Sequence, residues 1–288
     1  MKFFKMNGIG NDYIFLNCIS KEPSNPNELA KFLCNRNFSV GGDGLVLILP
    51  SYSANFKMRI FNADGSEAEM CGNAIRCVGK YAYEKSFIKS PVITVETLAG
   101  IKRLQLLTAS GKVEGVTVNM GMPILIPELI PVASESHKPI IDKEIEVGED
   151  KYLYSAVSMG NPHAVIFVSD VKSFDVAKVG SLIENHSDFP SRTNVEFVEV
   201  VDSETIKVRV WERGTGETLG CGTGACASAV ICEIKGLIRG ECKVIMKGGD
   251  LSVRVGSDIY LTGTADYAFE GTVNLPKEYK FIKTVSEV

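Results

Sequence analysis

The chain has 288 residues, of which 45% are hydrophobic and 23% charged, and its formal net charge at pH 7 is −4. This length predicts two domains, and the composition is typical of a soluble globular protein. The acidic excess argues against nucleic acid as a partner. We expect no signal peptide, because the N-terminal residues have lysines but no apolar h-region, and no membrane span, because no apolar run reaches about 18 residues. Eight cysteines without a CxxC pair favour a reducing cytoplasm over a disulfide framework.

The first half of the chain reads as short strands with a surface helix. Polar residues interrupt the opening strand between Asn7 and Asp12, and Asn25 or Asn27 caps a predicted helix over 26–36. Apolar and alternating segments predict further strands at 41–50, a hairpin within 91–107 and a strand at 113–120.

The second half repeats this order after prolines at 123, 127 and 131, which mark a crossover. Its predicted elements are an interrupted strand over 152–168, a helix within 174–186, strands at 194–200 and 206–211, a hairpin of 242–246 with 251–255, and a strand at 259–262. The segment from residue 267 has no counterpart, so we expect it to return to the first domain. We therefore predict an N-terminal domain of residues 1–120 plus 267–288 and a C-terminal domain of residues 121–266.

Two stretches share an unusual order of features. Residues 208–236 hold the end of a strand, a glycine-rich turn, Cys221 and a helical run that is apolar on all sides. A helix of this kind belongs inside a domain. Residues 58–85 repeat the order around Cys71.

The two stretches belong to an internal duplication. Cys71 and Cys221 lie 150 residues apart, and the same offset joins Gly10-Asn11 to Gly160-Asn161, Leu45–Ile48 to Val195–Val198, Arg59 to Arg209, Glu67 to Glu217, Gly72 to Gly222 and Lys85 to Lys235. A constant, domain-sized offset indicates two like domains. We expect the two cysteines to face each other across a cleft between these domains.

A cysteine at a helix N-terminus is expected to be reactive. The helix macrodipole and the first-turn amides favour thiolate over thiol, and the amides at Gly222 and Thr223 can bind a carboxylate. Two opposed cysteines suit inversion of a carbon stereocentre, because a thiolate removes a proton from one face while a thiol returns one to the other. Duplicated helix ends would also stabilise charge on the α-carboxylate.

The two cysteines also allow other interpretations. The cysteines can be small core residues, although the duplication argues for more. A redox pair is usually CxxC, and a nucleophilic cysteine needs a histidine, whereas the duplication repeats none of His137, His163 and His186. Zinc-ligand spacing is missing, so no metal is expected. The turn GCGTGACA (220–227) resembles a dinucleotide-binding turn with imperfect glycine spacing, which leaves an oxidoreductase as a further alternative.

Five motifs carry a resemblance to a known family. They are KMNGIGNDYIFLN (5–17), FNADGSEAEMCGNAIRC (61–77), GNPHAVIFV (160–168), RTNVEFVEV (192–200) and WERGTGETLGCGTGAC (211–226). With them, nearly the full chain resembles the diaminopimelate epimerases of lysine and peptidoglycan precursor biosynthesis. The resemblance implies an α/β (α+β) fold of two pseudo-symmetric duplicated domains. Each domain is a curved, mostly antiparallel sheet around a central buried helix, with the active site in the cleft between them.

The resemblance also implies an activity and the residues that carry it. It implies cofactor-independent epimerisation of L,L-2,6-diaminopimelate to the meso isomer by a cytoplasmic homodimer. The family's first cysteine is usually the proton donor and its second the acceptor, which here are Cys71 and Cys221. The implied contacts are the amides of Gly72-Asn73 and Gly222-Thr223 to the α-carboxylate, Asn11 and Glu212 to the α-amino end, Asn62, Asn161, Asn194 and Arg213 to the distal end, with His163 and Glu212 supporting the catalytic groups.

Two other functions are alternatives to diaminopimelate epimerisation. A proline or hydroxyproline racemase-like enzyme of the same fold would not need the distal recognition set. A noncatalytic ligand-binding protein would not need both cysteines. Many family members have glutamine where this chain has Gly44, so we assign Gly44 no direct contact with substrate.

Overall fold

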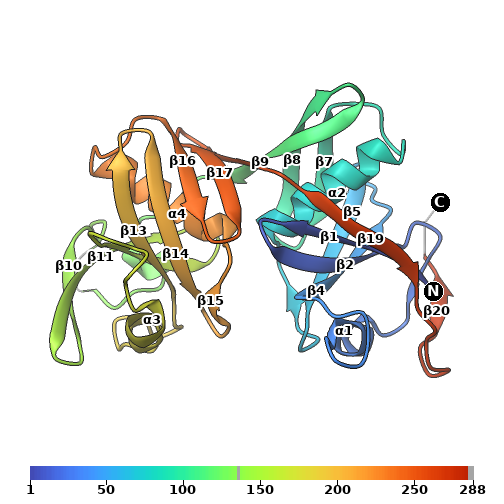
Figure 1. The fold of residues 1–288 in the computed structure, drawn as a ribbon, viewed down its shortest axis with the longest axis horizontal. Helices are drawn as coiled ribbons and strands as arrows, with labels where there is room; N and C mark the ends of the chain where they lie inside the picture. Colours follow the sequence, from blue (N-terminus) through green and yellow to red (C-terminus); the bar gives the residue numbers. More distant parts are fainter. Residues whose placement is uncertain (135–136, 285–288) are drawn as a thin grey trace. The chain divides into compact units, whose positions relative to one another are not determined.

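The computed structural model describes residues 1–134 and 137–284 and divides into two compact units (Figure 1). Unit 1 comprises Met1–Val118 and the segment from Gly263 onward, and unit 2 comprises Asn119–Thr262. Residues 285–288 of the predicted N-terminal domain and residues 135–136 of the predicted C-terminal domain lie outside the described residues.

Unit 1 is built on a mixed, mostly antiparallel sheet. Its strands follow the order β19 (Asp266–Thr272), β1 (Lys2–Gly8), β2 (Asn11–Asn17), β4 (Gly44–Leu49), β5 (Phe56–Asn62), β7 (Val92–Thr97), β8 (Gly100–Ala109) and β9 (Lys112–Gly121). The β2–β4 and β5–β7 pairs are parallel and the other pairs in this order are antiparallel. The short β6 (Glu67–Ala68) pairs with β5, and β3 (Lys21–Pro23) pairs with β20 (Phe281–Lys283) in a small separate sheet.

Unit 2 repeats this sheet strand for strand. Its order is β10 (Lys143–Val147), β11 (Asp150–Ser158), β12 (Pro162–Phe167), β13 (Asn194–Asp202), β14 (Thr205–Glu212), β16 (Glu241–Met246), β17 (Gly249–Arg254) and β18 (Ile259–Gly263), with β15 (Gly216–Thr218) on β14. The β12–β13 and β14–β16 pairs are parallel, as are their counterparts in unit 1. The duplication predicted from the constant offset is therefore confirmed in the strand pairing.

The central helices of the two units are related by the same offset. Helix α2 (Gly72–Glu84) and helix α4 (Gly222–Ile234) begin and end 150 residues apart. In α4 the residues from Gly224 to Cys232 are all buried, and the helix contacts β11 to β14, β16 and β17, so the sheet curves around it. A helix that is apolar on every side forms here because strands cover it from several directions. The predicted fold class, with mostly antiparallel curved sheets around buried helices, is confirmed.

The outer helices start at side-chain caps and cover a second face of each sheet. Asn25 caps α1 (Pro26–Cys34) by accepting the amide of Glu28, and Asp175 caps α3 (Val176–Glu184) by accepting the amide of Lys178. Helix α1 packs with β2, β4 and β5 around a core that includes Leu29, Leu33, Leu45 and Phe61. Helix α3 packs in the same way against β13 and β14, with Val179 and Ile183 in the core.

The structure differs from the sequence expectation at the end of the first helix and at the edge of the second sheet, and the paired strands β3 and β20 were not predicted. The helix expected over 26–36 ends at Cys34, because Asn35 is extended and its side chain accepts the amides of Asn37 and Phe38. The proline-rich crossover is followed by a strand that was not predicted, β10, which forms the edge beside β11. In unit 1 the equivalent edge is β19, from the segment after residue 266 that was predicted to return there.

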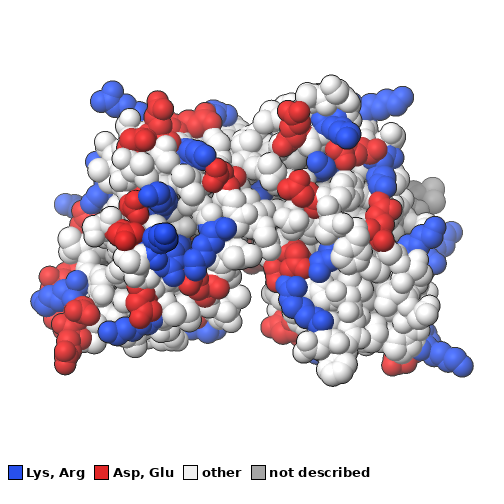
Figure 2. Space-filling view, in the orientation of Figure 1, with Lys and Arg blue, Asp and Glu red and all other residues white. Residues whose placement is uncertain are grey.

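Acidic and basic side chains are intermixed over the visible face of each unit (Figure 2). Many are paired, as in Lys85 with Glu270 and Lys207 with Glu199. Within the described part of the chain, the helices are too short or too polar to cross a membrane.

Candidate active site

Cys71 and Cys221 stand at the same point of the two units, directly before the first turn of the central helix. Both have extended backbones, with φ and ψ of −137° and 122° for Cys71 and −119° and 118° for Cys221. Each follows a strand, a turn and a second short strand, β5–β6 in unit 1 and β14–β15 in unit 2. The first-turn amides of α2 and α4 have no preceding helical carbonyl to bind, so they can donate hydrogen bonds to an anion there.

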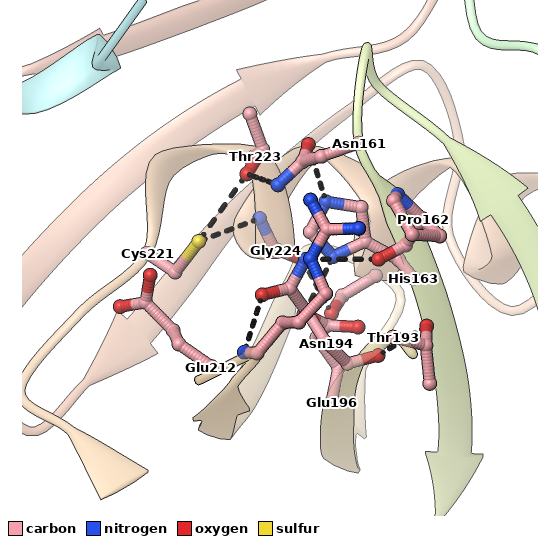
Figure 3. Close-up of polar contacts among 12 residues, drawn as sticks. Asn161, Pro162, His163, Thr193, Asn194, Glu196, Glu212, Cys221, Thr223 and Gly224 are labelled. Atoms are coloured by element: carbon pink, nitrogen blue, oxygen red, sulfur yellow. Dashed lines mark hydrogen bonds and ion pairs between the residues drawn. The ribbon is translucent and has the colours of Figure 1, made fainter. Parts of the chain in front are cut away.

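The sulfur of Cys221 lies within a set of hydrogen bonds at the start of α4 (Figure 3). Thr223 Oγ1 is 3.2 Å from Cys221 Sγ, and the amide of Gly224 donates to the same sulfur at 3.3 Å. The sulfur is buried, and because it accepts the Gly224 amide it caps the helix. The Thr223 hydroxyl and the Gly224 amide together fix the direction of the thiol.

A chain of polar contacts continues from Thr223 into the unit. Asn161 Nδ2 donates to Thr223 Oγ1 at 3.3 Å, and Asn161 Oδ1 is 3.0 Å from His163 Nε2. The other ring nitrogen, Nδ1, is 2.7 Å from Glu196 Oε1. The contact between His163 and Glu196 is drawn in Figure 3. Both residues have 0% exposed surface, so the pair is fully enclosed by the fold.

Glu212 lies at the end of β14 on the other side of the Cys221 sulfur (Figure 3). Its Oε1 accepts a hydrogen bond from Thr218 Oγ1 at 2.5 Å, and its carboxylate also interacts with Cys221. Burial raises the pKa of the Glu212 carboxyl, and the nearby Glu196 carboxylate acts in the same direction. Glu212 is thus an acceptor whose proton affinity is increased where it meets the thiol.

The electrostatic expectation for Cys221 is wrong. Its position at a helix N-terminus predicts a lowered pKa, yet burial raises the pKa of the thiol well above its usual range, and Glu212 and Glu196 raise it further. Hydrogen bonds from Thr223 and Gly224 oppose this rise without cancelling it. The neutral thiol is the favoured form because two carboxylates in a dehydrated site outweigh the first-turn amides.

Asn194 and Arg213 are joined to the same neighbourhood. Asn194 Nδ2 donates to the carbonyl of Pro162 at 2.8 Å, and Asn194 Oδ1 accepts the amide of Arg213 at 2.9 Å. The Arg213 side chain is exposed and donates to the carbonyl of Ser191 at 3.1 Å. The residues predicted in the second half, from Asn161 to Thr223, therefore gather around the start of α4.

The surroundings of Cys71 in unit 1 are different in kind. Tyr13 Oη donates to Cys71 Sγ at 3.3 Å, and the sulfur is 3.6 Å from Asn11 Oδ1. Asn73 Nδ2 also donates to Asn11 Oδ1, at 3.2 Å, and the fully buried Arg76 donates to Asn73 Oδ1 at 2.9 Å. Cys71 is thus surrounded by neutral groups with an arginine behind them.

The orientation of Asn11 is set by an acidic neighbour. Asn11 Nδ2 donates to Asp43 Oδ2 at 2.6 Å, so its oxygen points to Cys71 and Asn73. Asp43 in turn accepts from Arg36 Nη2 at 2.7 Å. Asn62, by contrast, donates to Ser66 in the turn after β5, and its contact with substrate stays a prediction.

Gly44, which departs from the pattern of the resembling family, is explained by packing. A Cβ at this position would lie 2.6 Å from the carbonyl oxygen of Phe61 and 2.9 Å from Cε1 of Tyr13. A side chain therefore does not fit while Tyr13 keeps its place beside Cys71.

The family model described as diaminopimelate epimerase matches residues 3–126 and 155–268 of this chain. The chain belongs to the diaminopimelate epimerase family. The protein named diaminopimelate epimerase from Methanococcus maripaludis strain S2 is 54% identical over 278 residues, which cover 96% of this chain and 100% of that protein. The one from Acetivibrio thermocellus is 52% identical, over 96% of this chain and 99% of that protein.

The fold is shared more widely than this family. The crystal structure of a hydroxyproline epimerase from Agrobacterium vitis has a TM-score of 0.69 at 15% identity and covers 95% of this chain and 90% of that one. At this identity the likeness shows the fold alone.

Two residues of this diaminopimelate epimerase family member were not singled out from its sequence. Tyr13 is 150 residues before His163, so the duplication offset points to it. Glu196 replaces Val46 of the first repeat within an otherwise apolar strand segment, which is the signal of a buried carboxylate with a special partner. In residues 1–134 and 137–284, no group of three or more His, Cys, Asp and Glu side chains is arranged to hold a metal ion.

Proposed function

We propose that the chain converts L,L-2,6-diaminopimelate to the meso isomer without a cofactor, by a two-base reaction of Cys71 and Cys221. Membership of the diaminopimelate epimerase family supports the reaction, and the protein is accordingly an isomerase. The observation that supports the mechanism is the repetition of a cysteine at the N-terminus of each central helix. Inversion of an α-carbon requires acid and base groups on its two faces, and the duplication supplies one for each.

In the proposed reaction a thiolate takes the α-proton and the opposite thiol delivers a proton to the other face. The electron pair left on the α-carbon delocalises into the α-carboxylate. The first-turn amides of Gly72-Asn73 and Gly222-Thr223 bind that carboxylate and stabilise the added charge. After one turnover the two cysteines have exchanged protonation states, and proton exchange with water restores them before the next turnover in the same direction.

The different surroundings of the cysteines support different starting states. The pKa of the Cys221 thiol is raised by burial and by Glu212 and Glu196, so we propose that Cys221 starts as the proton donor, which reverses the order that the family resemblance implies. Cys71 donates to Asn11 Oδ1 as a thiol, and the hydrogen bond that it accepts from the Tyr13 hydroxyl would stabilise the thiolate once the proton has left. Glu212 accepts from the Cys221 thiol and His163 orients Asn161, so both serve the sulfur rather than the substrate carbon.

The remaining polar residues are proposed to recognise the rest of the substrate. Asn11 and Glu212 bind the reacting α-amino group. Asn62, Asn161, Asn194 and Arg213 bind the distal amino-acid end. The exposed guanidinium of Arg213, whose backbone is fixed by Asn194, can form a bidentate pair with the distal carboxylate.

We further propose that the enzyme is a cytoplasmic homodimer in lysine and peptidoglycan precursor biosynthesis, with the amino acid as substrate and neither nucleic acid nor membrane as partner. The eight cysteines in a chain of this size support a reducing compartment. Light scattering of the purified protein measures the oligomeric state directly.

Proton NMR of the reduced protein with L,L-2,6-diaminopimelate in D2O, with no cofactor added, tests the proposed function. Loss of the α-proton signal together with appearance of the meso isomer is the expected result. Exchange with proline or hydroxyproline instead would keep the two-base reaction and replace the substrate. Absence of exchange with every amino acid tried would overturn the proposal.

A further inference from the structure

The pair of Glu196 and His163 is unusual because it is an acidic and a basic side chain with no exposed surface. Glu196 Oε1 contacts His163 Nδ1, while Glu196 Oε2 is buried without a hydrogen-bond partner among the described residues. A buried carboxylate is costly unless a positive charge or several donors face it. The group that faces Glu196 is His163, so the pair is stable when the ring is protonated.

The groups that face His163 from the neighbouring elements are acidic. They are Glu196 on β13, whose Oε1 contacts the ring, and Glu212 on β14, whose carboxyl group interacts with the ring electrostatically. Each of these stabilises a positive ring. The ring's second nitrogen, Nε2, contacts Asn161 Oδ1, which is a hydrogen-bond acceptor. Both ring nitrogens therefore have oxygen acceptors, which is the pattern of a doubly protonated imidazolium.

The state of the ring determines how Asn161 is turned. When Nε2 carries a proton, Asn161 presents its oxygen to the ring and its amide group donates to Thr223 Oγ1, as observed. When Nε2 carries none, the amide must turn so that its nitrogen donates to the ring. Asn161 Oδ1 then faces Thr223 and accepts its hydroxyl proton.

Thr223 has a single hydroxyl proton, so these two arrangements have different consequences for Cys221. In the observed arrangement Thr223 Oγ1 accepts from Asn161, and its own proton can be donated to Cys221 Sγ, 3.2 Å away. In the turned arrangement the proton goes to Asn161, and Thr223 can only accept from the thiol. The first stabilises a thiolate and the second a thiol.

We propose that Glu196 is a positioning residue that keeps His163 doubly protonated and thereby directs the Thr223 hydroxyl proton to the sulfur of Cys221. Its catalytic significance rests on the proposed role of Cys221 as a proton donor and acceptor. A thiol between two carboxylates must ionise in every turnover, and this relay supplies the opposing donor. Gly224 makes room for it, because a Cβ there would lie 2.7 Å from Glu196 Oε1.

Nitrogen NMR of the protein labelled with 15N-histidine tests the first half of the proposal. The chain has three histidines, and the resonances of His137 and His186 are assigned by substituting each in turn. We expect both ring nitrogens of His163 to be protonated at neutral pH, and one of them to lose its proton in Glu196→Gln. The matched control is Glu199→Gln on the same strand, whose carboxylate binds Lys207 and should leave the ring unchanged. A neutral His163 ring in the unsubstituted protein would overturn the proposal, whether or not the variant folds.

Alkylation of Cys221 by iodoacetamide tests the second half, in a Cys71→Ser background with the modified peptide followed by mass spectrometry. Glu196→Gln should slow alkylation near neutral pH about tenfold, because a hydrogen bond to the charged sulfur is lost. If Glu196 acted merely as a negative charge beside the sulfur, its removal would instead speed alkylation, and that result would contradict the relay.

A double-mutant cycle assigns the effect to the relay. In a Thr223→Val protein, Glu196→Gln should slow alkylation no further, whereas Thr223→Ser should restore its full effect. A further tenfold loss in the Thr223→Val protein would refute the coupling. These readouts do not depend on turnover, so the relay can fail while the proposed function stands, and the reverse.

Discussion

Tyr13 and His163 occupy equivalent positions in the second strand of their repeats, yet they serve their cysteines in different ways. Tyr13 Oη donates directly to Cys71 Sγ at 3.3 Å, whereas His163 reaches Cys221 through Asn161 and Thr223. The residue beside Cys221 at the end of β14 is Glu212, and its counterpart in unit 1 is Asn62. A duplicated framework thus holds one thiol next to a neutral donor and the other next to carboxylates.

Substitution of Tyr13 by phenylalanine should reduce kcat about 10- to 100-fold with little change in KM. The variant keeps the packed ring and removes the donor to Cys71 Sγ, and a hydrogen bond to a charged group is worth about 1.5–3 kcal/mol. Steady-state kinetics of epimerisation measures the effect. Tyr279→Phe, which changes a tyrosine packed on Phe32 in the same unit, is the matched control and should retain full activity. Unchanged kcat in Tyr13→Phe would exclude this hydrogen bond from the reaction.

The frame of the site was predictable from sequence because the repeat fixes it. The offset of 150 located both cysteines, both asparagines at positions 11 and 161, and the limits of α2 and α4 to within a few residues. Repeated residues report a shared backbone, and a shared backbone brings the same positions to the start of the central helix.

The chemical difference between the two halves was not predictable in the same way. Glu196 contacts His163, 33 positions away, and its charge acts on Glu212 of β14 and on Cys221. No local sequence pattern describes these relations. The sign of the Cys221 pKa shift depended on burial and on two carboxylates that meet only in the folded unit. The position of Cys221 at a helix N-terminus was predicted correctly, but the effect of the first-turn hydrogen bonds on its pKa is weaker than that of burial and the two carboxylates.

Replacement of Gly44 by alanine should destabilise unit 1 and disturb Tyr13. The added Cβ would meet the backbone oxygen of Phe61 at 2.6 Å, which cannot move without shifting β5. Overpacking of this kind costs about 1–3 kcal/mol. Urea unfolding measures it, and Gly115→Ala is the control, because its nearest neighbour would lie at an ordinary 3.4 Å. Equal stability of the two variants would contradict the packing argument.

Stability should fall at alkaline pH because the buried thiols resist ionisation. Burial raises the pKa of the Cys77 thiol from 9.0 to about 12, and it does the same for Cys18, Cys34, Cys232 and Cys242. Above pH 9 the unfolded chain has lost thiol protons that the folded chain keeps, so the free energy of unfolding decreases as pH rises from 9 towards 12. Each thiol contributes at most about 1.4 kcal/mol per pH unit.

Urea titrations between pH 8 and pH 11 test this dependence. The comparison of slopes is more informative than absolute stability, since Cys77→Ala also removes buried atoms from α2. The variant should lose less stability per pH unit than the parent protein. A slope as steep as that of the parent would assign the alkaline loss to other groups.

Suitable substitutions should separate the catalytic role of each thiol from its structural role. Cys71→Ala and Cys221→Ala should each lower turnover about 10²- to 10⁴-fold, the range attributed to one acid or base group. Cys221 also caps α4 by accepting the amide of Gly224, so Cys221→Ala should lose about 0.5–2 kcal/mol of stability. Cys221→Ser keeps an acceptor at the cap and should fold with nearly parental stability while remaining as inactive as the alanine variant, because a hydroxyl ionises far less readily than a thiol. Thermal unfolding and epimerisation assays on the three variants distinguish the roles, and an active serine variant would remove Cys221 from proton transfer.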